Sequence, residues 1–409
     1  MKDYVVAIDL GSATIKAGLG HKSHNGIEIV AIYETPSYGI KRGMINNTQK
    51  VSESIKKAVE GLSKLTDIEK FEYFPVVVGV NGKNIFTAKS SKGMISTRVN
   101  KPIDDNDIKR VIEQAKIGAV IPNEHEILYV HPNVFHVDSL KNIKNPIGMY
   151  ARRLEVEAYV VSVESLILKN IRAILNNAGI SNADIYLNVI AQKYGILDEE
   201  DTDSLIIVDI GKHLTTLSLW DSNGLDYVTV YEQGIVDILS EISKEVMIPS
   251  GTCESILKSI IINSVYDIDY EDQEIEINDS RRSQTLKVSS RLVYNIIESV
   301  VSKIFSRIYA DIEKTGFLKR FSTPSLYISG GIAEIKGIEV LAENIFNLPV
   351  YIAKVSLKVN NQSYLGPRYI TLAGLIKLYF DSPGNEIKKN NKNKSFIDVI
   401  ITKLREMLE

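Results

Sequence analysis

The chain has 409 residues, enough for two or three domains, and its 44% hydrophobic and 24% charged residues are typical of an ordinary globular protein. A net charge of −3 argues against nucleic acid as the main partner, because phosphate backbones attract a strong basic excess, and the single cysteine suits a reducing cytoplasm. The charged N-terminal segment, the lack of any run of about 18 apolar residues and the scattered histidines lead us to expect no signal peptide, membrane-spanning helix or structural metal site.

Two passages about 200 residues apart resemble each other. VVAIDLGSATIKAGL surrounds Asp9 and Gly11, and LIIVDIGKHLTTLSLW surrounds Asp209 and Gly211. Each pattern indicates a buried β-branched strand, an Asp-x-Gly turn and a second strand of alternating polarity. Two such hairpins predict a protein made of two homologous halves.

Strands and helices alternate around each hairpin. In the first half we predict strands at 27–33 and 74–80 and helices at 49–65 and 165–178. In the second half we predict strands at 225–231, 325–329 and 350–353, and helices at 235–246, 253–262, 289–315 and 337–346. This alternation predicts an α/β fold with helices packed on central sheets.

Two segments interrupt this pattern. Residues 83–162 carry their own helix, predicted at 104–117, between strand-like runs, and so predict an inserted α+β subdomain in the first half. Residues 381–394 have almost no apolar content and predict a flexible linker.

Three segments have the chemistry of a nucleotide contact. Glycines allow the backbone to approach phosphates, small hydroxyl residues donate hydrogen bonds, and acids hold Mg²⁺ through water. Residues 9–13 have all three of these features, and residues 209–215 have them in part. At the end of a third strand, Gly330 and Gly331 would allow a flat base or ribose to lie against the backbone. Each segment alone is usually an ordinary turn, but the three in this order make a specific pattern.

In these segments the chain resembles the actin, sugar-kinase and heat-shock-chaperone ATPases. The resemblance implies a two-lobed, actin-like (ribonuclease H-like) fold with phosphate loops at 9–16 and 209–216, an adenosine segment at 325–337 and connecting helices at 165–178 and 365–380. It also implies ATP as cofactor and Mg²⁺ held through water by Asp9 and Asp209. The implied ATP-binding residues are Asp9, Gly11, Ser12, Ala13, Lys16, Asp209, Gly211, Lys212, His213, Thr215, Lys258, Gly330 and Gly331.

A closer resemblance rests on further motifs. They are GIKRGMINN at 39–47 and, in and beside the insertion, NGKNIFTAKSSKGMI, IDDNDIKRVIEQAK, EHEILYVHPNVFHVD and PIGMYARRLEVEAYVV. These motifs resemble those of the FtsA family of bacterial cell-division proteins. The resemblance implies a first half at 1–82 and 163–200, interrupted by the insertion at 83–162. It implies a second half at 201–364, with its smaller subdomain at about 232–320, and then a helix at 365–380 that returns to the first half. The chain would end in the linker at 381–394 and a membrane-targeting helix at 395–409. It implies a scaffold that forms filaments with itself, tethers the FtsZ ring to the inner face of the cytoplasmic membrane at the division site, and recruits later division proteins.

The second phosphate loop departs from the D-I-G-G-G-T-T-D pattern of that family. Lys212 and His213 stand at two glycine positions, Leu214 at a threonine position and Thr216 at the final acid position. Side chains there can obstruct the backbone's approach to phosphate, although a lysine can add positive charge. We expect phosphate binding to be altered but retained.

Two further departures affect the ribose and the chemistry. Aligning Lys258 with the family's A-E-x-x-K pattern puts Ser255 at the glutamate position and turns Glu254 about 100° away, which makes Glu254 a doubtful ribose ligand. Asn188 or a neighbour stands where hydrolysing relatives orient the attacking water, and neither Asn188 nor Gln192 can act as a base. We therefore expect a nucleotide binder with at most weak ATPase activity.

The long helix predicted near residue 289 offers a basic surface for a partner. Arg291, Lys303 and Arg307 are available for the acidic C-terminal tail of FtsZ, which the family binds in this region. The alternative is that these side chains form an ordinary solvated helix face.

Residues 395–408 predict an amphipathic helix that lies in the membrane surface. Its apolar side consists of Phe396, Ile397, Ile400, Ile401, Leu404, Met407 and Leu408. Residues 388–409 contain six basic and three acidic residues, and this positive charge favours binding to an anionic membrane. The alternative is a helix docked on the body of the protein, which the polar linker disfavours. The terminal helix distinguishes the hypothesis of an FtsA-type division protein from the two alternatives, a pilus-assembly actin homologue or another actin-fold ATPase.

Overall fold

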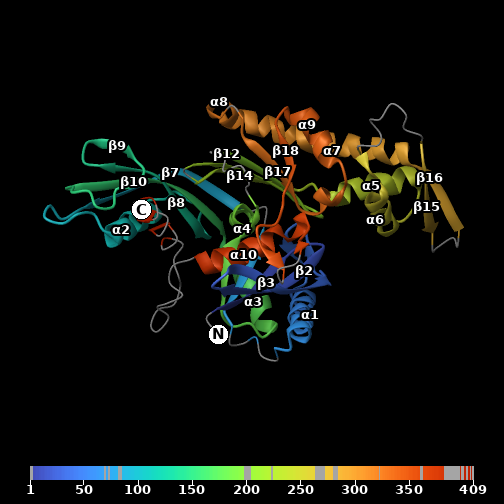
Figure 1. Cartoon of the computed structure of the whole chain (residues 1–409), viewed down its shortest axis with the longest axis horizontal. Helices are drawn as coiled ribbons and strands as arrows, with labels where there is room; N and C mark the ends of the chain where they lie inside the picture. Colours follow the sequence, from blue (N-terminus) through green and yellow to red (C-terminus); the bar gives the residue numbers. More distant parts are fainter. Residues whose placement is uncertain are drawn as a thin grey trace.

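The computed structural model describes residues 3–409 except 69–70, 72–73, 82–84, 198–203, 223, 263–271, 280–283, 322, 360–362, 382–396, 398–399, 402–403, 406 and 408–409. Its described part has two lobes, each built on its own sheet, with a separate four-stranded sheet at one end (Figure 1). None of the described helices is both long and apolar enough to cross a membrane.

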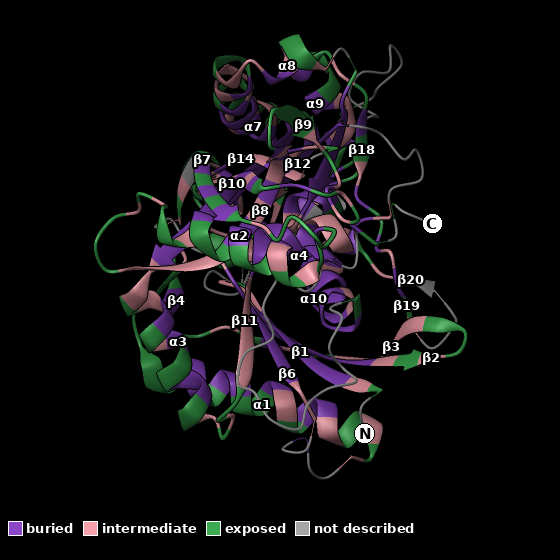
Figure 2. Cartoon of the chain, turned by 90° about the vertical axis from the view of Figure 1, so that its left-hand side faces the viewer, coloured by how far each residue is buried: buried purple, intermediate pink, exposed green. Residues whose placement is uncertain are grey.

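The first lobe is built on a seven-stranded sheet in the order β11-β6-β1-β2-β3-β19-β20. The strands are β1 (Tyr4–Leu10), β2 (Thr14–Ser23), β3 (Gly26–Pro36), β6 (Val76–Val80), β11 (Ala183–Leu187), β19 (Lys358–Val359) and β20 (Ser363–Tyr364). Helices α1 (Thr48–Thr66) and α3 (Ser165–Asn177) cover one face of this sheet, and α10 (Ile370–Asp381) covers the other (Figure 2). A short hairpin of β4 (Ile40–Lys41) and β5 (Met44–Ile45) precedes α1.

The second lobe repeats this plan on a five-stranded sheet in the order β14-β13-β12-β17-β18. Its strands are β12 (Ser204–Ile210), β13 (Thr215–Asp221), β14 (Gly224–Tyr231), β17 (Ser325–Ser329) and β18 (Val350–Ile352). In each lobe the first strand pairs antiparallel with the second and parallel with a later strand, and Asp9 lies opposite Lys16 as Asp209 lies opposite Thr216. The predicted pair of homologous hairpins is therefore confirmed.

The helical part of the second lobe contains α5 (Ile235–Val246), α6 (Ser250–Ser259), α7 (Ser290–Thr315), α8 (Phe317–Arg320) and α9 (Ile338–Phe346), with the hairpin of β15 (Glu274–Asp279) and β16 (Gln284–Ser289). The long helix α7 begins where the Ser289 hydroxyl accepts a hydrogen bond from the backbone of Leu292, and it ends at Gly316, whose φ of 71° suits glycine. Its boundaries match the predicted helix at 289–315 to within one residue.

Two helices, α4 (Asn188–Gly195) and α10, cross closely in the middle of the molecule. Their contact consists of small residues: a Cβ atom on Gly374 would lie only 1.7 Å from the backbone oxygen of Ala191, and one on Gly195 only 2.0 Å from that of Ile370. The helix predicted from residue 365 begins at Ile370, after a 3-10 turn at Pro367–Tyr369. Asn188 and Thr371, at the starts of the two helices, line the cavity between the lobes.

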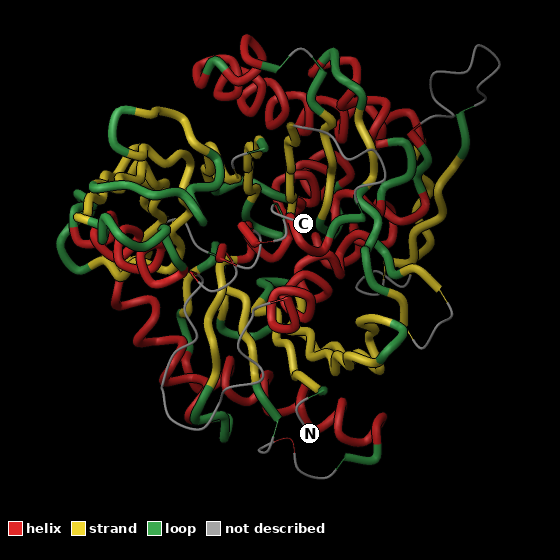
Figure 3. Tube along the Cα trace, turned by 60° about the vertical axis from the view of Figure 1, so that its left-hand side comes forward, coloured by secondary structure: helices red, strands yellow, loops and turns green. Residues whose placement is uncertain are grey.

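The four-stranded sheet has the order β7-β10-β8-β9, with β7 (Ile85–Ser96), β8 (His125–Val137), β9 (Leu140–Ile143) and β10 (Arg153–Glu164). Helix α2 (Asp105–Ile117) packs on it and is capped by Asp104, whose carboxylate accepts the backbone N–H groups of Asn106 and Asp107. Figure 3 shows these strands as a separate group backed by one helix. We call this sheet together with α2 the inserted subdomain.

The end of the chain returns to the inserted subdomain, and Figure 1 places the C-terminus beside α2 and β8. Ile397, Ile400, Ile401 and Leu404 are helical and share one hydrophobic core with that subdomain. The amphipathic pattern is thus present, but its apolar face is docked on the protein, contrary to our expectation that the linker would keep it apart. Phe396, Leu408 and the linker beyond Asp381 lie outside the described residues, and Met407 is exposed.

Candidate functional site

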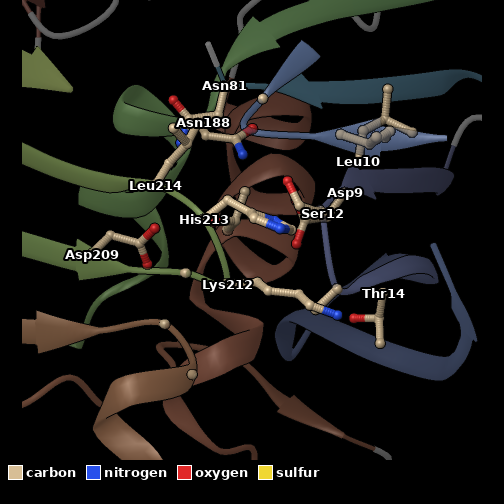
Figure 4. Close-up of a pocket in the computed structure, with 18 of the residues that line it drawn as sticks. Asp9, Leu10, Ser12, Thr14, Asn81, Asn188, Asp209, Lys212, His213 and Leu214 are labelled. Atoms are coloured by element: carbon tan, nitrogen blue, oxygen red, sulfur yellow. The ribbon is translucent and has the colours of Figure 1, made fainter. Parts of the chain in front are cut away.

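A cavity of about 680 Å³ lies between the two lobes. The two Asp-x-Gly turns face each other across it, and the turn after β17 forms part of its wall (Figure 4). Eleven of the predicted nucleotide-binding residues line it, namely Asp9, Gly11, Ser12, Ala13, Lys16, Asp209, Gly211, Lys212, His213, Gly330 and Gly331. Residues more than 300 positions apart in the sequence therefore meet at one site.

The first turn carries a buried ion pair. The Nζ atom of Lys16 donates to Oδ2 of Asp9 at 2.8 Å, and both residues are almost entirely buried. Burial lowers the pKa of Lys16, but the charge of Asp9 and its hydrogen bond outweigh burial and hold that pKa above its usual value. Lys16 is thus a fixed cation at the wall of the cavity, 5.9 Å from the ring of Tyr369.

The second turn carries Asp209, whose Oδ1 accepts a hydrogen bond from the Ser329 hydroxyl at 2.9 Å. Burial, together with the nearby charge of Asp9, raises the pKa of Asp209. Asp9 and Asp209 come from opposite lobes, and a cation between the two carboxylates would stabilise the charged form of Asp209. Among the described residues no group of three or more His, Cys, Asp and Glu side chains could hold a metal ion, so protein ligands alone do not complete a coordination shell here.

Lys212 and His213 lie at the positions where the D-I-G-G-G-T-T-D pattern of the second phosphate loop has glycines. In Figure 4 both side chains reach from the second turn toward the first, Lys212 in the direction of Thr14 and His213 beside Ser12. Burial and the positive charge of Lys212 lower the pKa of His213, so its imidazole is neutral near pH 7. These two side chains line the cavity beside the second turn, and Lys212 supplies it with one more cation.

After β17, Gly330 and Gly331 lie where neighbouring atoms leave no room for a Cβ atom. Gly330 has a φ of 81°, and a Cβ atom there would lie 2.5 Å from the backbone oxygen of Ile210 and 2.9 Å from Oδ1 of Asp209. A Cβ atom on Gly331 would meet the side chain of Ile235, which also lines the cavity. This turn leaves a flat backbone surface at the site predicted for adenosine.

Contacts beside the cavity join the two lobes. The Asn81 amide donates to the Thr216 hydroxyl at 3.1 Å. Arg368 lies between Glu34 of the first lobe, at 2.7 Å, and Glu334 of the second, at 3.3 Å. Asn81, Glu334 and Arg368 all line the cavity. We did not predict them, because the segments that contain them do not mark these single polar residues as part of a site.

The structure corrects several of our site predictions. Thr215 is completely buried and donates to the backbone oxygen of Gln233, and it is not among the residues that line the cavity. Glu254, which we considered doubtful, does line the cavity, whereas Ser255 donates to the backbone of Thr252. The position of Lys258 on α6 is described but its side chain is not.

Two residues considered for water positioning differ in their surroundings. Asn188 lines the cavity, and its buried Oδ1 has no hydrogen-bond partner in the described structure. Gln192 is almost completely buried and makes a long contact of 3.5 Å with the Thr371 hydroxyl. Asn188 is therefore the better placed of the two to meet a ligand.

The basic residues predicted for a partner do not form one patch. Arg291, Lys303 and Arg307 are all exposed on α7, but at about 100° per residue Arg291 and Arg307 point to nearly opposite sides of the helix. Arg307 donates to the Gln233 side chain at 3.3 Å and lies over the ring of Tyr231. A short peptide could contact Lys303 and Arg307 together, or Arg291, but not all three on one face.

Comparison with known proteins identifies the inserted subdomain. Residues 83–162 match the family model described as the SHS2 domain inserted in FtsA. Over its whole length the chain is similar to the cell division protein FtsA of Borreliella burgdorferi, with 25% identity over 99% of this chain and 98% of that protein. It is also 27% identical to the FtsA of Bacillus subtilis over 91% of this chain and 82% of that one.

Solved structures show the same fold. The PilM-PilN type IV pilus biogenesis complex matches with a TM-score of 0.61 at 13% identity, covering 91% of this chain and 97% of that chain. MreB5 of Spiroplasma citri, in a structure bound to AMPPNP, matches with a TM-score of 0.53 at 14% identity, covering 91% of this chain and 95% of that chain. The predicted actin-like fold and the predicted resemblance to FtsA are both confirmed.

Proposed function

The chain resembles the FtsA cell-division proteins over nearly its full length and carries their SHS2 domain, and we propose that it is an ATP-binding scaffold of the bacterial division machinery. Its proposed role is to assemble into actin-like filaments, to hold the FtsZ ring at the cytoplasmic face of the inner membrane, and to recruit later division proteins. The observation that carries the proposal is the cavity between two equivalent Asp-x-Gly turns, in a chain that resembles the FtsA proteins.

ATP fits the chemistry of the cavity wall. Ser12 and Ala13 with Gly11 would present backbone and hydroxyl donors to the phosphates, and Lys16 and Lys212 would neutralise their charge. The flat surface at Gly330 and Gly331 would take the adenosine. The MreB5 relative is described as bound to AMPPNP, a nucleotide of this class.

The described residues also fit Mg²⁺ held through water. Asp9 and Asp209 project from facing turns, and a water-coordinated ion between them would favour the charged form of Asp209, whose pKa is raised by burial and by the charge of Asp9. Mg²⁺, when bound, would supply charge neutralisation to the phosphates. Lys16 would either keep its bond to Asp9 and so hold that carboxylate in place, or turn to a phosphate oxygen.

Slow turnover is expected at this site. Phosphoryl transfer needs a well-positioned water and stabilised phosphate charge. Asn188 can orient water but cannot accept its proton, and His213 stands where a glycine would let the backbone approach the phosphates. A turnover in the range of dedicated kinases, roughly 1–100 per second, would refute the proposal that the chain is mainly a nucleotide binder.

Attachment of the FtsZ ring requires two contacts. The terminal helix would bind the anionic membrane through the predicted apolar face, and the second lobe would bind the acidic FtsZ tail through α7. The likeness to PilM reaches only 13% identity and so shows the fold alone, whereas the match to the SHS2 domain of FtsA favours the division role over a pilus-assembly role.

A reconstitution tests the tether. Anionic vesicles are sedimented with the full chain and a labelled FtsZ tail peptide, and we expect the peptide to pellet. A chain that ends at Lys394 should leave it in solution, Arg291→Glu should reduce its recovery, and Lys319→Glu, another exposed basic site outside α7, serves as the charge-matched control. Equal recovery with the full and the shortened chain would rule out the terminal helix as the membrane anchor.

A further inference from the structure

The terminal helix buries one regular stripe of side chains. Ile397, Ile400, Ile401 and Leu404 follow the spacing of one helix face and are each no more than 6% exposed. A terminal helix that merely rested against the surface would leave part of such a stripe in water. These four side chains instead belong to a hydrophobic core.

The other side of that contact is a groove on the inserted subdomain. The core that encloses the four side chains also contains the buried face of α2, namely Ile108, Val111, Ile112 and Ala115, and buried residues of β8 and β10. Around it lie the partly buried Ile143, at the end of β9, and Ile147 and Met149, in the segment between β9 and β10. The groove is therefore formed by one helix, one sheet and one loop of a single subdomain.

Polar contacts fix the position of the helix in this groove. The guanidinium of Arg405 donates through Nη2 and Nε to the two oxygens of Asp105, at 2.6 and 3.2 Å. The Asn145 amide donates to the backbone oxygen of Leu404 at 2.6 Å, while its own oxygen accepts from the backbone of Ile147. A backbone oxygen near a helix end needs such a partner, so Asn145 caps the docked helix.

We propose that the groove of the inserted subdomain is a binding site for the chain's own terminal amphipathic helix, and that this site competes with the membrane for the helix. The competition rests on the proposed membrane role of that helix. The four aliphatic side chains that fill the groove are the ones that would enter the lipid surface, and they cannot be buried in both places. The docked chain is thus a closed form, and membrane attachment requires the helix to leave the groove.

Competition has a measurable consequence. If only a fraction of the chains have the helix released, the apparent dissociation constant for membrane is the intrinsic one divided by that fraction. Stabilising the docked form weakens membrane binding, and any ligand that takes the groove strengthens it. Attachment to the membrane can then be adjusted without any change in the helix itself.

A covalent lock tests this directly. In the variant Asp105→Cys with Arg405→Cys, a short bismaleimide joins the two thiols when the helix is docked, while Cys253 is completely buried and so protected from the reagent. We expect the locked protein to remain in solution with vesicles that contain anionic phosphatidylglycerol, and the same variant without the reagent to pellet. Equal pelleting of both forms would overturn the proposal.

A second variant opens the groove without touching the helix. Asp105→Arg with Asn145→Ala places a like charge beside Arg405 and removes the cap, and should raise the affinity for vesicles several-fold. Glu113→Arg is the matched control, because it makes the same charge change on α2 but its partner is Lys116. An affinity no higher than that of the control would also overturn the proposal.

The two proposals fail differently. If the membrane role is wrong, neither the full chain nor the opened variant pellets more than a chain ending at Lys394, yet cross-linking at positions 105 and 405 still proceeds. If the groove is wrong, the full chain pellets but cross-linking is no faster than for a pair of cysteines at positions 113 and 405.

Discussion

The crossing of α4 and α10 offers a sharp test of the fold, because it depends on glycine. Gly374→Ala adds a Cβ atom that would lie 1.7 Å from the backbone oxygen of Ala191, 2.4 Å from its carbonyl carbon and 2.9 Å from the backbone nitrogen of Gly195. All three are backbone atoms of α4, so no side chain can rotate away. The helices must separate by more than about 1 Å to restore an ordinary contact.

The size of the effect follows from overpacking. Forcing extra volume into a tight contact costs about 1–3 kcal/mol, and the roughly 1 kcal/mol that Gly→Ala normally gains inside a helix offsets part of that cost. The net loss is then at most about 2 kcal/mol. An unfolding entropy of about 2.1 cal/mol/K per residue gives roughly 0.9 kcal/mol/K for this chain, so we expect the unfolding midpoint to fall by up to about 2 °C and to lie about 1–3 °C below that of an unstrained Gly→Ala variant. Because Asn188 and Thr371 line the cavity from these two helices, nucleotide affinity should fall as well.

Differential scanning calorimetry and ATP titration measure the two effects. Gly251→Ala is the matched control, since α6 leaves open space around that position and the substitution should be neutral or slightly stabilising. If Gly374→Ala were as stable as Gly251→Ala and bound nucleotide normally, the close crossing of α4 and α10 would not hold in solution.

Three further predictions concern the cavity. Lys16→Met leaves the buried Asp9 without its cation and should lower the free energy of unfolding by about 3–5 kcal/mol, and adding Asp9→Asn should recover most of that loss. Denaturant unfolding of the single and double variants measures both effects. A double variant that is no more stable than Lys16→Met would contradict the ion-pair explanation. A bound phosphate should raise the lowered pKa of His213, so nucleotide affinity should increase as the pH falls from about 8 to about 6, and this dependence should disappear in His213→Ala. Glu254→Ala should weaken ATP binding about tenfold and abolish any preference over 2′-deoxy-ATP, and equal loss for both nucleotides would show that Glu254 does not contact the ribose.

Sequence reasoning succeeded where the pattern is local and repeated. The two hairpins were predictable because buried strands, an acid and a glycine recur in the same order around Asp9 and Asp209. The helices α1, α2, α5 and α7 were predictable from their apolar spacing and caps. Most of the residues predicted for the nucleotide site line one cavity, because glycine and acid positions mark the turns that face it.

The errors arose where tertiary packing decides. Thr215 continues the second motif, but β13 turns its hydroxyl toward Gln233 rather than into the cavity. Glu254, which we considered a doubtful ribose ligand from its alignment, lines the cavity from α6, and its contact with the ribose stays a prediction. Asn81 and Arg368 lie in segments that carry the family resemblance, but nothing in those segments marks them as contacts between the lobes.

The position of the terminal helix shows the same limit. Its apolar stripe is evident in the sequence, but a stripe does not say whether lipid or protein covers it. The groove that receives it is made by α2, the four-stranded sheet and the loop around Asn145, which all lie within residues 85–164.

A crystal structure of the full chain with ATP and Mg²⁺ tests the central proposal most directly. We expect the triphosphate between the turns that carry Asp9 and Asp209, with Lys16 or Lys212 within hydrogen-bond distance of its oxygens, and the adenosine against Gly330 and Gly331. A crystal of the Gly11→Val variant grown under the same conditions should contain no nucleotide, since a Cβ atom on Gly11 would lie 2.6 Å from the backbone oxygen of Thr14 and distort the first turn. An empty cavity in the parent chain at saturating ATP, or nucleotide bound elsewhere, would contradict the proposed site.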